Sequence, residues 1–364
     1  MTYLDYQATT PLAPEALAAM LPWLESQHAN PHSSHKAGRA ARAAVEVARE
    51  QVAALLPAGG TLSFTSGATE ALNWALKGCG EGRIVTIATE HAAVLDTVRA
   101  AEAKGREVVV LPVGGDGLVD MAAAREAIRP GIALVAAMLV NNEIGVIQPV
   151  ADLAALAHEA GALMLCDAVQ GYGRVAIPAE CDLIAISAHK VHGPKGIGGL
   201  WIRDGVHIAP LLHGGGQEKA GRSGTLSPAL CAGFGAAAQL AAGRRDADAE
   251  HVAALWDAAL DAFTDGWVIN GSTEHRYRGN LNLRHEGLDV NRLMSELRDI
   301  AFSAGSACAS GSGRSSHVLR GIGLSDREAR SSIRLGFGRY TQKEELIAAI
   351  HRIDEAAHSQ TVFA

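Results

Sequence analysis

The sequence predicts an α/β protein with a large, doubly wound domain and a smaller α+β domain. Short apolar runs of strand length alternate with helical stretches from about residue 60 to 210, and the chain then changes character at AAGRRDADAEHVAALWDAAL. Several of the runs are continuously apolar, which is typical of strands covered on both faces in a mostly parallel sheet. We expect the large domain at residues 15–245 and the small domain at 1–14 together with 246–364.

The large domain is expected to contain one mostly parallel, seven-stranded sheet. Its strands are predicted at Thr61–Phe64, Arg83–Ala88, Glu107–Val113, Ile132–Met138, Ala162–Asp167, Asp182–Ser187 and Gly199–Arg203. The helices between them include 67–78 and 150–162, and the second of these ends at a glycine, as helices often do.

The small domain is predicted from the last third of the chain. A long helical stretch leads into strand-like runs at 267–270, 279–285, 301–305 and 331–338. A helix is expected near Val290–Asp299, and an amphipathic helix begins at about Lys343.

Composition excludes several classes of protein. The 364 residues carry a formal net charge of -7, so there is no basic surface for nucleic acid. No apolar run approaches the roughly 20 residues of a membrane span, and the N-terminal residues do not resemble a signal peptide. The five cysteines are odd in number and form no CxxC pair, so we expect no disulfide framework, no metal site and a cytoplasmic location. They are Cys79, Cys166, Cys181, Cys231 and Cys308.

Polar side chains follow several of the predicted strands, at the carboxyl ends where open α/β sheets bind ligands. The turn Thr65–Glu70, TSGATE, opens a helix whose free N–H groups could hold a phosphate. An ordinary helix cap is the alternative. The turn is no P-loop, because no GxxxxGK[ST] string occurs.

Lys190 comes just after the apolar run Leu183–Ile186, an unusual place for a solvated lysine. A desolvated lysine has a lowered pKa and is suited to a Schiff base, whereas the alternative is a stem that covers the sheet edge. Asp167 ends another strand, either as a helix N-cap or as the partner of a positive ring nitrogen, with Gln170 pointing to the same crevice. His91 also follows a strand. Together these features predict a pyridoxal phosphate (PLP) site.

Cys308 lies in a run of small residues, AFSAGSACASGSGRSSH, that offers little apolar burial. The other four cysteines have apolar surroundings that suit quiet core residues. An accessible thiol on a mobile loop becomes a nucleophile when its pKa is lowered. Downstream, Arg334 in SSIRLGFGR could bind a carboxylate bidentately, or could be an ordinary surface arginine.

These motifs resemble those of the cysteine desulfurases of the class V aminotransferase superfamily, which have the fold-type I PLP-dependent transferase architecture. The serine-rich cysteine loop is similar to that of the group with a long catalytic loop, which serves nitrogenase and general iron–sulfur assembly. The matching strings run in order over almost the whole chain: YLDYQATTP, NPHSSHKAG, FTSGATE, TEHAAVLDT, VNNEIGVIQPV, DAVQG, SAHKVHGPKGIGGL, HGGGQEKAGRSGTL, SAGSACASGS and SSIRLGFGRYT.

The resemblance implies a role for each matching residue. Lys190 would hold PLP as a Schiff base and move protons, Asp167 would pair with the ring nitrogen, and His91 would stack on the ring as an acid or base. Cys308 would attack the sulfur of the substrate cysteine. The remaining cofactor contacts would be Ala68, Thr69, Asn142, Gln170, Ser187 and His189, with Thr225 from the neighbouring subunit, and the substrate would be held by Arg334, Asn30 and Asn142.

The implied reaction converts L-cysteine to alanine and leaves a persulfide on Cys308. The implied partners are a second copy of the chain and a sulfur-acceptor protein, such as an iron–sulfur scaffold. Two alternatives remain at this point: a related PLP enzyme without sulfur chemistry, such as an aminotransferase or selenocysteine lyase, and a scaffold or regulator that has kept the fold alone.

Overall fold

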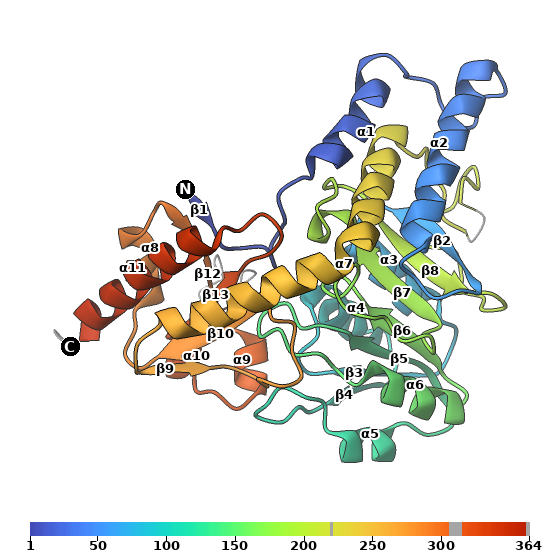
Figure 1. Ribbon diagram of the computed structural model, residues 1–364. Helices are drawn as coiled ribbons and strands as arrows, with labels where there is room; N and C mark the ends of the chain where they lie inside the picture. Colours follow the sequence, from blue (N-terminus) through green and yellow to red (C-terminus); the bar gives the residue numbers. More distant parts are fainter. Residues whose placement is uncertain (219–220, 306–314, 362–364) are drawn as a thin grey trace.

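A long helix connects two sheet-containing parts of the molecule (Figure 1). The computed structural model describes residues 1–218, 221–305 and 315–361. Helix α7 (Pro228–Ala262) packs near its start on α1 (Pro14–Glu25) and α2 (Lys36–Ala53), and it also contacts α11 (Lys343–Thr361) in the second part.

All seven strands predicted for the large sheet are present, and they form a single sheet in the order β2-β8-β7-β6-β5-β3-β4. Neighbours from β7 to β4 are parallel, whereas β8 is antiparallel to both β7 and β2, so the prediction of a mostly parallel sheet is confirmed. The strands are β2 (Gly60–Thr65), β3 (Arg83–Ile87), β4 (Val108–Leu111), β5 (Ile132–Met138), β6 (Leu163–Asp167), β7 (Leu183–Ser187) and β8 (Gly198–Arg203).

Helices bury both faces of this sheet, which explains why its strands are continuously apolar. In β7, Leu183 and Ala185 pack into the core beneath α3 and α4, whereas Ile184 and Ile186 pack into the core shared with α2, α5, α6 and α7. The covering helices not yet located are α3 (Ala68–Gly78), α4 (Ala92–Glu102), α5 (Met121–Ala127) and α6 (Val150–Glu159).

The second part is built on an antiparallel sheet in the order β12-β13-β10-β9. Leucine and isoleucine side chains of β10 and β13 pack with those of α8 and α11 in a separate core. A Ser325–Glu328 capping box begins α10. The remaining elements are β9 (Trp267–Ile269), β10 (Asn280–His285), α8 (Val290–Glu296), β12 (Ser303–Ala304), α9 (His317–Gly321), α10 (Asp326–Arg330) and β13 (Ser332–Gly336).

The N-terminal residues join this second part, because β1 (Thr2–Tyr3) pairs in parallel with β11 (Ile300–Ala301). The domain limits expected at residues 15 and 246 stay a prediction, and α7 crosses the second limit without a break. Within the described ranges, no helix is long and apolar enough to cross a bilayer.

Candidate active site

A cavity of about 600 Å³ lies at the carboxyl ends of the parallel strands. It is where the doubly wound architecture predicts a ligand, since the loops that follow β2, β3, β5, β6 and β7 meet there. Ten of the residues predicted from the sequence line it: Ala68, Thr69, His91, Asn142, Asp167, Gln170, Ser187, His189, Lys190 and Arg334.

Lys190 ends the short 3-10 helix η1 (Ala188–Lys190), which follows β7 directly. Its Nζ donates hydrogen bonds to the main-chain oxygens of Gln7, at 2.5 Å, and Ala8, at 2.8 Å. The amine therefore contacts the N-terminal segment, whose residues Gln7 and Ala8 also line the cavity.

Asp167 is a buried carboxylate at the end of β6. Its Oδ1 accepts a hydrogen bond from the Val169 N–H at 3.0 Å, and the residues that follow form turns, so the alternative of a helix N-cap is wrong. Burial raises the pKa of Asp167, while His91 and Lys190 act in the opposite direction. A positive ring nitrogen beside this carboxylate would favour its charged form.

His91 caps the N-terminus of α4, with its Nδ1 accepting a hydrogen bond from the Ala93 N–H at 3.0 Å. Burial lowers the pKa of this histidine, and the nearby Lys190 lowers it further, whereas Asp167 raises it. Because Nδ1 is an acceptor, the neutral ring carries its proton on Nε2.

The part of the cavity lining at the start of α3 is suited to an anion. Gly67 stands at the N-cap of α3 and no side chain caps this helix, so its first-turn N–H groups face the cavity together with Ser66 and Thr69. Lys195 adds a positive charge to the same lining. The neighbouring His189 is neutral, since burial and the charges of Lys190 and Lys195 lower its pKa to about 4.

These donors fit pyridoxal phosphate. Lys190 would supply an amine for the aldehyde, Asp167 a carboxylate for the ring nitrogen, and the uncapped start of α3 a cup for the phosphate. His91, on the wall of the same cavity, supplies an aromatic surface for the ring.

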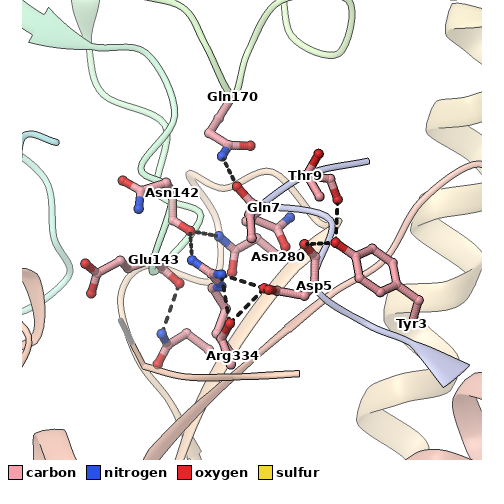
Figure 2. Close-up of polar contacts among 12 residues, drawn as sticks. Tyr3, Asp5, Gln7, Thr9, Asn142, Glu143, Gln170, Asn280 and Arg334 are labelled. Carbon is pink, nitrogen blue, oxygen red and sulfur yellow. Dashed lines mark hydrogen bonds and ion pairs between the residues drawn. The ribbon is translucent and has the colours of Figure 1, made fainter. Parts of the chain in front are cut away.

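Arg334, on β13, brings the second sheet to the cavity (Figure 2). Its side chain is 1 % exposed, and Nη2 lies 2.6 Å from Oδ1 of Asp5. It also donates from Nη1 to the Asn142 main-chain oxygen at 3.0 Å and from Nη2 to Ser303 Oγ at 3.3 Å. Three of the five N–H groups of the guanidinium thus have acceptors among the described residues, and the alternative of an ordinary surface arginine is wrong.

Two predicted residues of the described ranges do not line the cavity of this chain. Asn30 is exposed, with its Oδ1 accepting from the His32 N–H at 2.9 Å, and Thr225 is exposed in the segment that precedes α7. Cys308 lies outside the described residues. The other four cysteines are buried and free, as their apolar surroundings predicted.

The contribution of the N-terminal segment was not predictable from the sequence pattern. Asp5, Gln7 and Ala8 contact the predicted catalytic and substrate-binding side chains, yet no periodicity marks them. Their only signal was the string YLDYQATTP, to which no role was attached. Ser66 and Lys195 also line the cavity, and no pattern in the motifs FTSGATE and SAHKVHGPKGIGGL indicates a role for them.

The chain matches the family model for aminotransferase class V over residues 2–348. The cysteine desulfurase IscS of Rickettsia bellii (strain OSU 85-389) is 43 % identical over 367 residues, covering 96 % of this chain and 90 % of the relative. A solved structure titled as a NifS-like protein has a TM-score of 0.91 at 32 % identity and covers 98 % of this chain and 99 % of its own. A second, SspA in complex with cysteine, has a TM-score of 0.84 at 34 % identity and covers 94 % of this chain and all of its own (100 %).

The match to the family model, the full-length relatives and the cavity lined by Lys190 and Asp167 agree with one another. The chain therefore belongs to the class V aminotransferase family, in its branch of PLP-dependent cysteine desulfurases.

Proposed function

We propose that this protein converts L-cysteine to L-alanine and collects the sulfur as a persulfide on Cys308. The observation that carries the proposal is the convergence of Lys190, Asp167 and the uncapped start of α3 in one cavity, with Arg334 on its wall. The similarity to cysteine desulfurases over nearly the whole chain supports the choice of reaction.

The cofactor would be held at three points. Lys190 would bind it covalently, Asp167 would pair with its ring nitrogen, and Thr69, with the first-turn N–H groups of α3, would take its phosphate. When bound, PLP supplies an electron sink that weakens bonds next to the substrate's amino-bearing carbon. Asp167 maintains this property by keeping the ring nitrogen protonated.

Arg334 would receive the substrate carboxylate. Asp5 and the main-chain oxygen of Asn142 already orient the guanidinium. The side chain of Arg334 therefore loses little conformational entropy when the substrate binds. His91 would donate or accept a proton at Nε2, because its Nδ1 is occupied by the Ala93 N–H.

Sulfur transfer would occur at Cys308. Its thiolate attacks the substrate sulfur, so an S–S bond forms while the carbon–sulfur bond of the substrate breaks. The released electron pair stays with the carbon fragment, which takes up a proton and leaves as alanine. Cys308 keeps the sulfur as a persulfide, and a thiol of an acceptor protein or a reductant removes it.

The functional unit would be a homodimer in the cytoplasm. Thr225 does not line the cavity of its own chain and is exposed, which supports a role at the phosphate of a neighbouring subunit. The sulfur acceptor would be a separate protein, such as an iron–sulfur scaffold. The four described cysteines are free, in keeping with a reducing compartment.

The experiment measures the products formed from L-cysteine by the purified, PLP-loaded protein. With a thiol reductant present, we expect equal amounts of alanine and sulfide. A parallel reaction contains L-cysteine and a 2-oxo acid, which an aminotransferase would convert to a new amino acid without releasing sulfide. Formation of a new amino acid from the 2-oxo acid, without sulfide, contradicts the proposal.

A further inference from the structure

A second cavity, of about 260 Å³, lies beside α7 and shares no lining residue with the active-site cavity. Its walls come from α7, from the turn after β6, from the residues that follow Lys190, and from the loops before β10 and after β13. Arg174 separates the two cavities, because it donates to Gln170 Oε1 at 3.0 Å and to the Lys190 main-chain oxygen. The two cavities are therefore neighbours but distinct.

The walls of this second cavity carry a large excess of positive charge. The only carboxylate among the lining residues is that of Asp248. The lining includes five arginines, which are Arg174, Arg245, Arg276, Arg278 and Arg339. Asp248 is already paired with Arg339 at 2.6 Å and also contacts Arg244 at 3.3 Å. His192 adds no charge, because burial and Arg339 lower its pKa to about 3.

Arg276 is the most unusual of these cations. It is 6 % exposed, and its side-chain donors reach only main-chain oxygens, at 2.7 Å for Ile144, 3.0 Å for Ser272 and 3.1 Å for Asn280. Its guanidinium lies 4.7 Å from the centre of the Trp256 ring, and burial lowers its pKa to about 10. No carboxylate pairs with it among the residues that the structure describes.

Two buried N–H groups of this wall also lack an acceptor in the described part of the chain. They are Nε of Arg276 and Nη1 of Arg339, both shielded from solvent. Burying a charge or a donor without a partner is costly, and structures usually compensate it with a counter-ion, a bound ligand or water. The walls of the cavity therefore carry a positive charge that the carboxylate of Asp248 does not fully compensate.

We propose that this cavity is a binding site for a small oxyanion with two negative charges, such as inorganic phosphate or a short dicarboxylate. Guanidinium groups bind such oxygens bidentately and remain charged at any physiological pH. The volume of about 260 Å³ suits a small anion with a few waters. Arg245 and Arg278 are exposed and form the solvent side of the site, while Arg276 and Arg339 form its buried side.

The test is calorimetric titration of the PLP-loaded protein with inorganic phosphate and, separately, with succinate. The loaded protein is used because the cofactor fills the phosphate cup of the active site. Ionic strength is held constant with chloride, so that general screening is the same throughout. We expect saturable binding of one anion per chain, and the two titrations show whether the site takes a tetrahedral or a dicarboxylic anion.

The double variant Arg245→Ala/Arg278→Ala should bind the anion about tenfold more weakly or worse, as expected for the loss of two charge-assisted contacts. Both residues are exposed, so the fold should be retained. The control Arg298→Ala/Arg330→Ala removes the same charge from exposed positions outside the cavity and should bind like the unmodified protein. Absence of saturable binding of both anions, or equal affinity in the two double variants, overturns the proposal. Neither result depends on desulfurase activity.

Discussion

The carboxylate of Asp5 lies 2.6 Å from Nη2 of Arg334, although 328 residues separate them in the sequence. Two and three residues after Asp5, the main-chain oxygens of Gln7 and Ala8 accept hydrogen bonds from Lys190. One short N-terminal segment therefore contacts both the amine that would hold the cofactor and the guanidinium that would hold the substrate. Figure 2 shows the second of these contacts, between Asp5 and Arg334.

Replacing Arg334 by alanine should raise KM for cysteine much more than it lowers cofactor occupancy. Loss of a charge-assisted carboxylate contact should cost about 2–4 kcal/mol of transition-state binding. Asp5→Asn should raise KM by a smaller factor, because it removes only the group that orients Arg334. Steady-state kinetics and cofactor absorbance measure the two effects, and unchanged kinetics in Arg334→Ala would show that another group binds the carboxylate.

Lys190→Ala should abolish turnover and covalent attachment of the cofactor. Hydride reduction should fix the cofactor covalently to the unmodified protein but not to the variant. Mass spectrometry should then detect the added mass of the cofactor only in the unmodified protein. Lys195→Ala is the matched control, since Lys195 is the other lysine on the cavity lining and should leave covalent attachment intact. Full activity in Lys190→Ala, or loss of covalent cofactor attachment only in Lys195→Ala, would show that an amine other than that of Lys190 binds the cofactor.

Glu143 should make stability depend on pH. It is buried next to the cavity wall and bonded to Ser316, and burial raises the pKa of its carboxyl from 4.5 to about 7. Between pH 4.5 and about 7, the carboxyl of Glu143 is ionised in the unfolded chain but still protonated in the folded protein. The contribution of Glu143 to the free energy of unfolding is therefore greatest at low pH and decreases as the pH rises to about 7. Over this range the free energy of unfolding decreases by at most roughly 3 kcal/mol.

Glu143→Gln should remove this dependence, because the amide keeps an oxygen for Ser316 and does not ionise. Relative to the unmodified protein, the variant should gain stability between pH 5 and pH 8 in denaturant titrations. Glu274→Gln, at an exposed position, serves as the control and should follow the unmodified protein at both values. Parallel curves for Glu143→Gln and the unmodified protein would show that Glu143 is ionised throughout.

Shared active sites predict complementation between two inactive variants. Lys190→Ala lacks the amine, and Thr225→Glu places a negative charge where the neighbouring subunit's phosphate would bind. A mixed dimer contains one site with native Lys190 and native Thr225, so activity should partly return after subunit exchange. Exchange that is demonstrated by labelling but restores nothing would exclude a contribution of Thr225 across the interface.

The large sheet was predictable because burial on both faces leaves a strong local signal. The continuous apolar runs of β5 and β7 reflect packing against helices on both sides, and the polar residues that follow them then fall at one sheet edge. Lys190, Asp167 and His91 could be placed at one cavity for this reason, since the architecture alone brings the carboxyl ends of the strands together.

Other features depend on contacts that no local pattern encodes. The pairing of Asp5 with Arg334 joins the two ends of the chain. The hydrogen bond from Lys190 to Gln7 joins the N-terminal segment to the middle of the chain. The arginine-lined cavity likewise gathers Arg174, Arg276 and Arg339 from three separate loops, each of which looks like an ordinary polar turn in the sequence. Only the folded chain brings these charges together.

In the proposed reaction, the sulfur of cysteine moves to Cys308. The most direct measurement is a single turnover of the PLP-loaded protein with an equal amount of L-cysteine and no reductant, followed by peptide mass spectrometry and alanine analysis. We expect one additional sulfur atom on the peptide that contains Cys308, in an amount equal to the alanine formed, and neither product in Cys308→Ser, which should keep the cofactor's absorbance. Alanine formed at the native rate by Cys308→Ser, or the additional sulfur on a different cysteine, would contradict the account.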